Sequence, residues 1–237
     1  MPTRGLGDTV FDFLDKPLYA EYGGILGAFW VTIELTFFSA IGSLIWGTIL
    51  AAMRVSPVPV MRAFGAAYVN VVRNIPLTVI IVASSMVLAD QLLWTLGGSD
   101  SREISFRVAV LGFVAYTSCF VCETLRSGIN TVPIGQAEAA RALGLTFFQV
   151  LRIVVLPQAF RSVIAPLASV LIALTKNTTV TASIAGIEAA GLMAAMIERE
   201  SDKVMLVFAM FAVGFVILTL PMGMFLGWVA KKVSVKR

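Results

Sequence analysis

The chain has 237 residues, of which 58% are hydrophobic and 14% charged, and soluble globular proteins are only about 45–50% apolar, so we expect most of this chain to lie in lipid. The formal net charge of +4 comes without a basic run interleaved with aromatic residues, which argues against a nucleic-acid partner. Histidine is absent, which excludes a Ser-His-Asp triad and any metal site that needs an imidazole ligand.

Five apolar stretches are long enough to cross a membrane, which takes about 20 predominantly apolar residues. They cover approximately residues 25–53, 64–88, 107–129, 163–187 or beyond, and 204–230. Residues 1–24 carry the acids Asp8, Asp12, Asp15 and Glu21 and lack the pattern of a secretory signal peptide. We expect an extracytoplasmic segment at 1–24, a transmembrane domain at 25–230 and a basic cytoplasmic tail at 231–237.

The charges between these stretches predict the orientation, because Lys and Arg accumulate in short cytoplasmic loops. One set of connections is basic and holds the single acid Glu138, and the other set is rich in acids. The basic set contains Arg54, Arg62, Arg73, Arg126, Arg141, Arg152, Arg161, Lys231, Lys232, Lys236 and Arg237, and the acidic set contains Asp90, Asp100, Glu103, Glu198, Glu200 and Asp202. We therefore expect the N-terminus outside and the C-terminus in the cytoplasm.

The longest connection predicted to be cytoplasmic is residues 130–162, and it indicates two short helices. Residues 134–145 are rich in good helix formers, and Gly144 is a typical helix stop. Residues 147–155 form a second amphipathic segment, which we expect Leu156-Pro157 to close, because proline disfavours a helical conformation in the residue before it.

A motif inside this connection resembles a known family. Glu138-Ala139-Ala140, followed by Gly144 and later by Leu156-Pro157, is similar to the EAA loop of importers driven by ATP-binding cassettes. In that family the loop docks into a cleft of a separate ATPase subunit, so the resemblance implies an ATPase-coupling site. Its members here would be Gly135, Glu138, Ala139, Ala140, Gly144, Leu156 and Pro157. An ordinary cytoplasmic loop is the alternative.

Further patches resemble the permeases of the polar amino acid uptake group. They are Arg73-Asn74-Ile75-Pro76-Leu77, Glu123-Thr124-Leu125-Arg126-Ser127-Gly128-Ile129 and Leu174-Thr175-Lys176-Asn177-Thr178-Thr179, in which Thr179 replaces the usual serine. The resemblance implies an all-α polytopic protein of the bacterial inner membrane, like the permease of a type I ABC importer. It also implies a polar amino acid such as glutamate or glutamine as cargo.

The same resemblance implies the partners. They are ABC ATPase subunits, which would use ATP and Mg, a second permease subunit that is identical or homologous, an extracytoplasmic solute-binding protein and membrane lipid. The sequence contains no G-x-x-x-x-G-K-[ST] motif, so we expect no nucleotide, other cofactor or metal on this chain. We also expect no enzymatic activity of its own, only alternating access.

Charged residues inside the predicted spans are candidates for function, because they are expensive in lipid. Lys176 lies within the fourth predicted span, and Glu34, Glu123 and Glu188 are the available acids. Two roles would explain why a charged Lys176 lies within a span. It could form an ion pair with a glutamate, or these residues could take part in the solute path.

The residues after Lys176 leave two readings open. Asn177, Thr178 and Thr179 could border a polar gate at a broken helix or form hydrogen bonds between helices.

Two other functions remain open. An ion-coupled secondary transporter would need these glutamates as an ion or proton relay. A membrane scaffold without transport activity would need no coupling loop.

The pair Cys119 and Cys122 lies in an apolar stretch without a βαβ pattern, so we interpret it as packing rather than as a redox motif.

Overall fold

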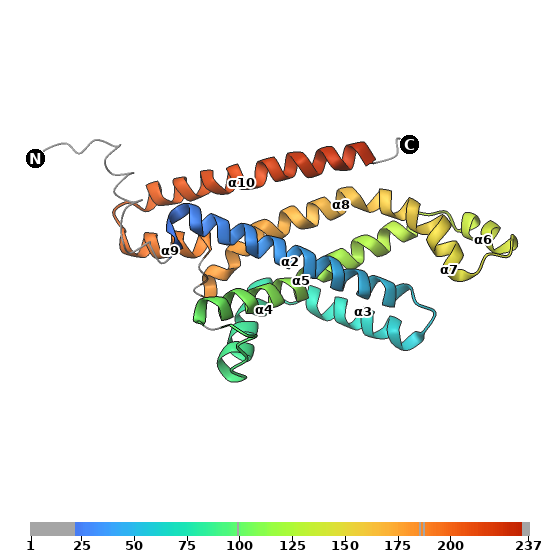
Figure 1. Cartoon of the computed structure of the whole chain (residues 1–237), viewed down its shortest axis with the longest axis horizontal. Coiled ribbons are helices and arrows are strands. Elements are labelled where there is room, and N and C mark those ends of the chain that lie inside the picture. The colour runs from blue at the N-terminus through green and yellow to red at the C-terminus, as the bar shows by residue number, and fades with distance from the viewer. Residues whose placement is uncertain (1–21, 99, 185, 187, 234–237) are drawn as a thin grey trace, which may run out of the picture. The chain divides into compact units, whose positions relative to one another are not determined.

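The computed structural model describes residues 22–98, 100–184, 186 and 188–233, and every regular element within these residues is a helix (Figure 1). The acids of the predicted 1–24 segment and the end of the basic tail, 234–237, lie outside the described residues. In chain order the helices are α2 (Gly24–Val55), α3 (Pro59–Arg73), α4 (Leu77–Ser84), the π-helix η2 (Ser85–Gln91), α5 (Ser101–Asn130), α6 (Ile134–Ala142), α7 (Phe147–Gln149), the π-helix η3 (Val150–Val155), α8 (Leu156–Asn177), the 3-10 helix η4 (Thr178–Ile184), α9 (Ala189–Arg199) and α10 (Val204–Val233).

Three of the five predicted spans are single long helices. They are α2, α5 and α10, of 32, 30 and 30 residues, and each is long enough to cross a hydrocarbon core of about 30 Å at about 1.5 Å per residue. Threonines inside α2 keep their hydroxyls satisfied within the helix, as when Thr36 donates to the Thr32 carbonyl at 2.8 Å. Hydroxyls paired in this way suit an apolar helix to lipid, although the buried hydroxyls of Ser39 and Ser43 in α2 have no hydrogen-bond partner within the described residues.

The second predicted span is not one helix. The apolar stretch is divided into α3 and α4, which form a bent pair with a break at Asn74–Pro76. Pro76 disfavours a helical conformation in Ile75 and cannot donate a backbone hydrogen bond, so the helix ends there. Hydropathy averaged over the stretch does not detect this break, because the residues on either side of Arg73 and Asn74 are mostly apolar. The described residues thus contain four helices able to span a membrane, or up to five if the bent pair counts as one.

The fourth predicted span begins earlier than expected, and the prediction that Leu156-Pro157 closes the preceding segment is wrong. Residues Phe147–Ile184 form one continuous helical run of 38 residues. The π-helix η3 directly precedes Pro157, which lies in the first turn of α8. Proline is tolerated in a first helical turn because its missing N–H has no required partner there.

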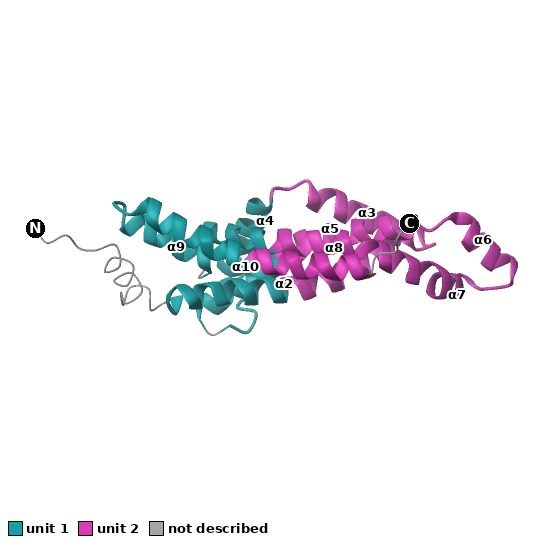
Figure 2. Ribbon diagram, turned by 90° about the horizontal axis from the view of Figure 1, so that it is seen from above, with its two compact units in different colours: residues 1–38, 77–112, 175–218 teal, residues 39–76, 113–174, 219–237 magenta. Residues whose placement is uncertain are grey.

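Contacts divide the chain into two compact units, coloured in Figure 2. Unit 1 comprises residues 1–38, 77–112 and 175–218, and unit 2 comprises residues 39–76, 113–174 and 219–237. The described part of unit 2 holds nine Lys and Arg residues and only two acids, Glu123 and Glu138. All six acids of the predicted acidic connections belong to unit 1. The basic and acidic connections that the sequence analysis distinguished therefore belong, within the described residues, to different units.

Each unit has an apolar core. In unit 1, Leu192, Met196, Val207 and Phe211 are buried together. In unit 2, Leu50 and Val69 pack with Cys119 and Cys122. Both cysteines are buried and free, which agrees with their interpretation as packing residues.

Candidate functional site

The segment from α6 to η3 has a small core of its own within unit 2. Ala140, Val150 and Val155 are buried, with Ile129, Val132 and Leu145 packed around them. Gln158 at the start of α8 also donates to Gln136 of α6 at 2.7 Å. A capping box starts α7, in which the Thr146 N–H donates to the Gln149 side-chain oxygen at 2.8 Å. These contacts hold the two short helical segments together as a hairpin.

Gly144 ends the first arm of this hairpin, as the sequence predicted. Its φ is +88°, a conformation that costs little for glycine and much for residues with a Cβ. The Gly144 N–H donates to the Arg141 carbonyl at 2.8 Å, and the Leu145 N–H donates to the Ala140 carbonyl at 3.2 Å. This is the Schellman arrangement, which satisfies the last carbonyls of a helix and reverses the chain.

The predicted coupling residues lie mostly on the surface of the hairpin. Gly135, Glu138, Ala139, Gly144, Leu156 and Pro157 are exposed, whereas Ala140 is buried. Large apolar side chains are exposed beside them, with Ile134 at 75% and Leu143 at 82%. A hairpin that has its own core and still exposes apolar side chains has the properties of a docking surface.

Lys176 lies at the end of α8 with an exposed side chain, and within the described residues it forms no ion pair. Its candidate glutamate partners have other contacts. Glu34 accepts from the Trp30 indole at 2.8 Å, Glu123 pairs with Arg54 and Arg126, and Glu188 caps α9. The ion pair predicted as one explanation of Lys176 is therefore not formed in the described part of the chain.

Glu123 belongs to an ion-pair cluster in unit 2 that joins α2 to α5. It contacts Arg54, whose side chain is only 13% exposed, and Arg126 at 3.2 Å. Sequence reasoning selected Glu123 but missed its partner Arg54. The available signal was an arginine in the last turn of a long apolar helix, where a guanidinium needs a carboxylate.

Glu188 lies in unit 1 with 1% of its surface exposed, and it caps the N-terminus of α9. Its two carboxylate oxygens accept from the Ala190 N–H at 2.8 Å and the Gly191 N–H at 2.9 Å. The neighbouring Ala189 N–H donates to the Thr32 hydroxyl of α2 at 3.2 Å. Glu188 therefore caps α9 and is shielded from solvent, while Ala189 links this end of α9 to α2.

The Asn177–Thr179 segment lies where α8 ends and the 3-10 helix η4 begins. Thr178 donates to the Thr175 carbonyl at 2.7 Å and Thr179 to the Lys176 carbonyl at 2.8 Å. Both hydroxyls thus bond to their own helix, as Thr181 does with Thr178 at 2.7 Å. These bonds account for the hydroxyls without a contact to another helix and mark a change of helix type near Lys176.

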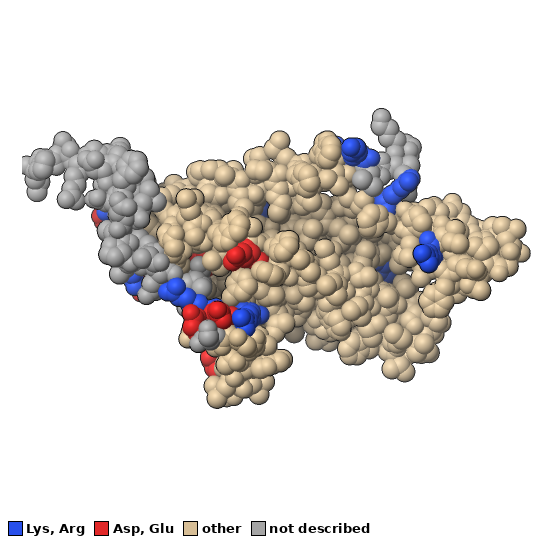
Figure 3. Space-filling model, viewed as in Figure 1, with Lys and Arg blue, Asp and Glu red and all other residues tan. Residues whose placement is uncertain are grey.

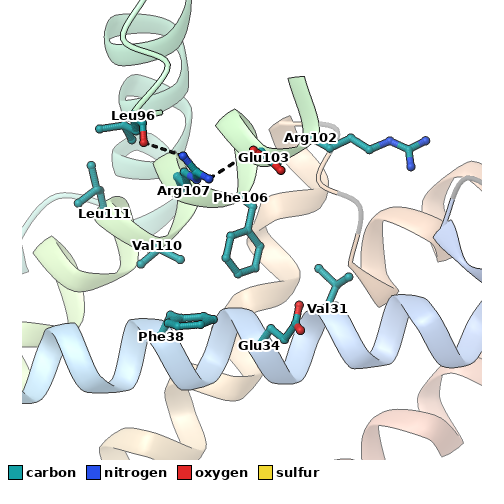
Figure 4. Close-up of a pocket in the computed structure, with 10 residues that line it drawn as sticks. All are labelled: Val31, Glu34, Phe38, Leu96, Arg102, Glu103, Phe106, Arg107, Val110 and Leu111. Carbon is teal, nitrogen blue, oxygen red and sulfur yellow. Dashed lines mark hydrogen bonds and ion pairs between the residues drawn. The ribbon is translucent and has the colours of Figure 1, made fainter. Parts of the chain in front are cut away.

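A groove of about 650 Å³ in unit 1, drawn in Figure 4, has apolar walls and paired charges. Arg107 donates to the Leu96 carbonyl at 2.7 Å and pairs with Glu103 at 3.3 Å. Leu96 has a φ of +51°, which is strained for a leucine. The guanidinium of Arg107 therefore holds a strained turn and has its charge paired with Glu103.

Most of the molecular face drawn in Figure 3 carries neither acidic nor basic side chains. Exposed large apolar residues include Phe37, Ile45, Met205 and Ile217. Within the described residues, no group of histidine, cysteine and acidic residues is placed to bind a metal ion. The part of the described surface that lacks charged side chains is suited to lipid, because charged side chains are costly there.

Comparison with known families matches residues 43–235 to the family described as "Binding-protein-dependent transport system inner membrane component". The glutamate transport system permease protein GluC of Corynebacterium efficiens is 56% identical over 226 residues, covering 93% of this chain and 99% of that protein. The protein of the same name from Corynebacterium glutamicum is 54% identical over 226 residues, with the same coverage of 93% and 99%.

A solved structure has the same fold. It is described as the crystal structure of an amino acid ABC transporter with histidines, and it superposes with a TM-score of 0.78 at 22% identity. The match covers 98% of this chain and 100% of that chain.

Proposed function

This chain belongs to the family of inner membrane components of binding-protein-dependent transport systems, and we propose that it imports a polar amino acid with ATP hydrolysed by a separate subunit. The hairpin of α6, α7 and η3 is the part on which this proposal depends. It is a rigid helical element with a core of its own and exposed apolar side chains. We infer that this surface binds the ATPase.

The proposed coupling residues are Gly135, Glu138, Ala139, Gly144, Leu156 and Pro157 at the surface, with Ala140 in the hairpin core. A movement of the ATPase would be transmitted through the hairpin core to α8, which follows it without interruption up to Asn177. The change of helix type at Thr178 lies beside Lys176. We infer that Lys176 and Asn177–Thr179 border the solute path.

Glutamate is the cargo that we propose. The support is the similarity over almost the whole chain to permease proteins of two glutamate transport systems. The exposed Lys176 agrees with an anionic amino acid, because a cation without a carboxylate partner favours a negatively charged solute.

We further propose that the basic connections lie on the cytoplasmic side of the membrane and the acidic connections on the extracytoplasmic side. The excess of Lys and Arg in unit 2 supports this orientation under the positive-inside rule. A second permease subunit would complete the path, two ATPase subunits would bind the hairpins, and a solute-binding protein would deliver cargo to the outer side.

Reconstitution tests the function. Proteoliposomes that contain this permease, its partner permease and its ATPase should take up labelled glutamate only when the solute-binding protein and ATP are both supplied. The same vesicles without the ATPase, under a sodium or proton gradient, should take up none. Uptake by the permease alone under such a gradient would instead identify an ion-coupled secondary transporter.

A further inference from the structure

A second groove, of about 950 Å³, lies entirely within unit 2. It is lined by the C-terminal ends of α2 and α5, the α2–α3 connection and the chain from α7 into α8. The walls include Ile49, Ala52, Pro57, Phe148, Leu151 and Phe160. Its volume is at the upper end of the range of about 300–1,000 Å³ that is typical of sites for small organic ligands.

A single charged residue, Arg161, lines this groove, and no carboxylate does. The Arg161 side chain is exposed and has no hydrogen-bond or ion-pair partner within the described residues. Arg62 is close in sequence to the α2–α3 connection, but its guanidinium already donates to the carbonyls of Ser56 and Pro57 at 3.1 and 3.2 Å. Arg161 is therefore the cation that this groove offers to a bound anion.

The charges of the other groove differ in this respect. In Figure 4 the guanidinium of Arg107 is directed at Glu103 and the Leu96 carbonyl, and Glu34 also lies at that groove. Acids accompany the bases there, so an anion would meet repulsion as well as attraction. An apolar ligand with a negatively charged end fits the groove in unit 2 and not the groove in unit 1.

A stripe of exposed apolar side chains on α2 leads to the groove in unit 2. Ile41, Ile45 and Ile49 are 43%, 59% and 43% exposed, and their spacing of four residues places them on one face of the helix. Thr48 of the groove donates its hydroxyl to the Leu44 carbonyl at 2.6 Å, so it does not require water. Residues of this kind normally face lipid, and the stripe ends in the groove at Ile49.

We propose that the groove in unit 2 is a binding site for one anionic glycerophospholipid of the surrounding membrane. An acyl chain follows the α2 stripe into the apolar walls, and the phosphate pairs with Arg161. Exposed Phe148 and Phe160 line the site and give its walls apolar surface that an acyl chain can cover. The proposed orientation in the membrane would make this lipid one of the inner leaflet, but the site itself does not depend on that orientation.

Occupancy of this groove has a consequence for the hairpin. Phe147, Phe148 and Leu151 line the groove and belong to α7 and η3, the second arm of the hairpin. A bound acyl chain fills the space between this arm and α2, next to the proposed coupling residues Leu156 and Pro157, which also line the groove, and restricts the movement of the arm. The lipid therefore supports the element to which the ATPase binds.

Photolabelling of the complete importer tests the site. The purified complex is placed in nanodiscs made of equal parts of phosphatidylcholine and phosphatidylglycerol, with a trace of photoactivatable phosphatidylglycerol, and labelled peptides are mapped. We expect labels at the end of α2 and at residues 147–163. Arg161→Gln should reduce this labelling about fivefold, since one basic residue near an anionic lipid surface contributes about 1 kcal/mol.

Three further variants make the result specific. Lys231→Gln removes a charge from the exposed end of α10, outside the groove, and should leave labelling unchanged. Arg161→Lys keeps the charge and should label like the unaltered complex. Ala52→Trp fills the groove without altering Arg161 and should abolish labelling by phosphatidylglycerol at these peptides.

Equal labelling of the unaltered, Arg161→Gln and Lys231→Gln complexes would overturn the proposal. A photoactivatable amino acid at position 52 that captures the partner permease or the ATPase, and no lipid, would overturn it as well, because a protein surface would then occupy the groove. Neither readout requires ATP or solute uptake. The proposed lipid site can therefore be disproved without disproving the transport function, and the transport function can be disproved without disproving the lipid site.

Discussion

Glu188 illustrates how a buried carboxylate can serve structure at a position that sequence alone assigns to transport. Its oxygens accept from the Ala190 and Gly191 amides, and 1% of its surface is exposed. We predict that Glu188→Ala lowers the free energy of unfolding by about 2–6 kcal/mol, because each of two buried amides loses its acceptor at a cost of about 1–3 kcal/mol. Denaturant unfolding in detergent micelles measures the change.

The matched control is Glu198→Ala on the same helix. Glu198 is exposed and forms no hydrogen bond or ion pair within the described residues, so its loss should change the free energy of unfolding by less than about 0.5 kcal/mol. Equal destabilisation by the two substitutions would show that Glu188 is not the cap of α9.

Lys176 offers the opposite case, a charge without a structural partner. Its exposed side chain forms no ion pair within the described part of the chain, so Lys176→Met should leave the thermal stability of the purified subunit unchanged. We predict that it slows glutamate uptake by about tenfold or more, since hydrogen bonds to charged groups contribute about 1.5–3 kcal/mol. Lys176→Arg, which keeps the charge, should retain most of the uptake. Normal uptake by Lys176→Met would exclude it from the solute path.

At the scale of the residue, the sequence marks charges within apolar stretches but does not show what each charge does. Lys176 and Glu123 were selected because charge is expensive in an apolar stretch. What the sequence could not supply was the pairing. Glu123 contacts Arg54, 69 positions away, and hydropathy along the chain contains no information on which helices become neighbours.

At the scale of the element, Gly144 determines whether the hairpin reverses between its two arms. A Cβ at this position would meet open space, so only the backbone conformation restricts the residue. We predict that Gly144→Val strains the turn by about 1–3 kcal/mol and reduces co-purification of the ATPase, while the permease still inserts into the membrane. Pull-down of the ATPase from detergent extracts measures the effect.

Asparagine provides the comparison, because it tolerates the left-handed conformation better than a β-branched residue. Gly144→Asn should therefore recover most of the ATPase binding that Gly144→Val loses. If both variants bound the ATPase as well as the unaltered chain, the turn would not be needed for docking.

The ion-pair cluster joins two other elements, α2 and α5. Glu123→Ala would leave the guanidinium of Arg54, which is 13% exposed, without its carboxylate. Breaking a buried pair in this way costs about 3–5 kcal/mol, so we predict a large fall in thermal stability in detergent. Arg126→Ala should cost far less, because Arg126 is 39% exposed and exposed pairs contribute about 0–1 kcal/mol. If the two substitutions lowered the thermal stability equally, the buried pair of Glu123 with Arg54 would not be the main stabilising contact of the cluster.

Elements were predictable where apolar length alone decides them. The spans at α2, α5 and α10 fall close to the expected residues because each is one uninterrupted helix. The bent pair α3 and α4 was expected to be one helix, since Ile75-Pro76 breaks a helix within a stretch where apolar residues outnumber polar ones such as Arg73 and Asn74. Pro157 had the reverse effect: it was expected to end a helix, and the π-helix before it lets the helical run continue.

At the scale of the whole molecule, the sequence predicted the all-α membrane fold, and comparison with solved permeases supports it. It did not predict that helices such as α2 and α5 would each contribute to two compact units. This division depends on which side chains of different helices meet, as in the core around Leu50 and Cys119. The separation of charge between the units was nevertheless visible in the connections.

The orientation in the membrane is the property of the whole molecule on which the transport proposal rests. Glu138 of unit 2 and Glu198 of unit 1 are both exposed, and the native Cys119 and Cys122 are buried, so they should not react with an aqueous reagent. In intact cells, a membrane-impermeant maleimide should label Glu198→Cys at once and Glu138→Cys only after permeabilisation. The positive-inside rule requires this order, because the bases accompany Glu138. The reversed order would place the α6–η3 hairpin outside the cell, where no ATPase has access to ATP, and the proposed coupling would be impossible.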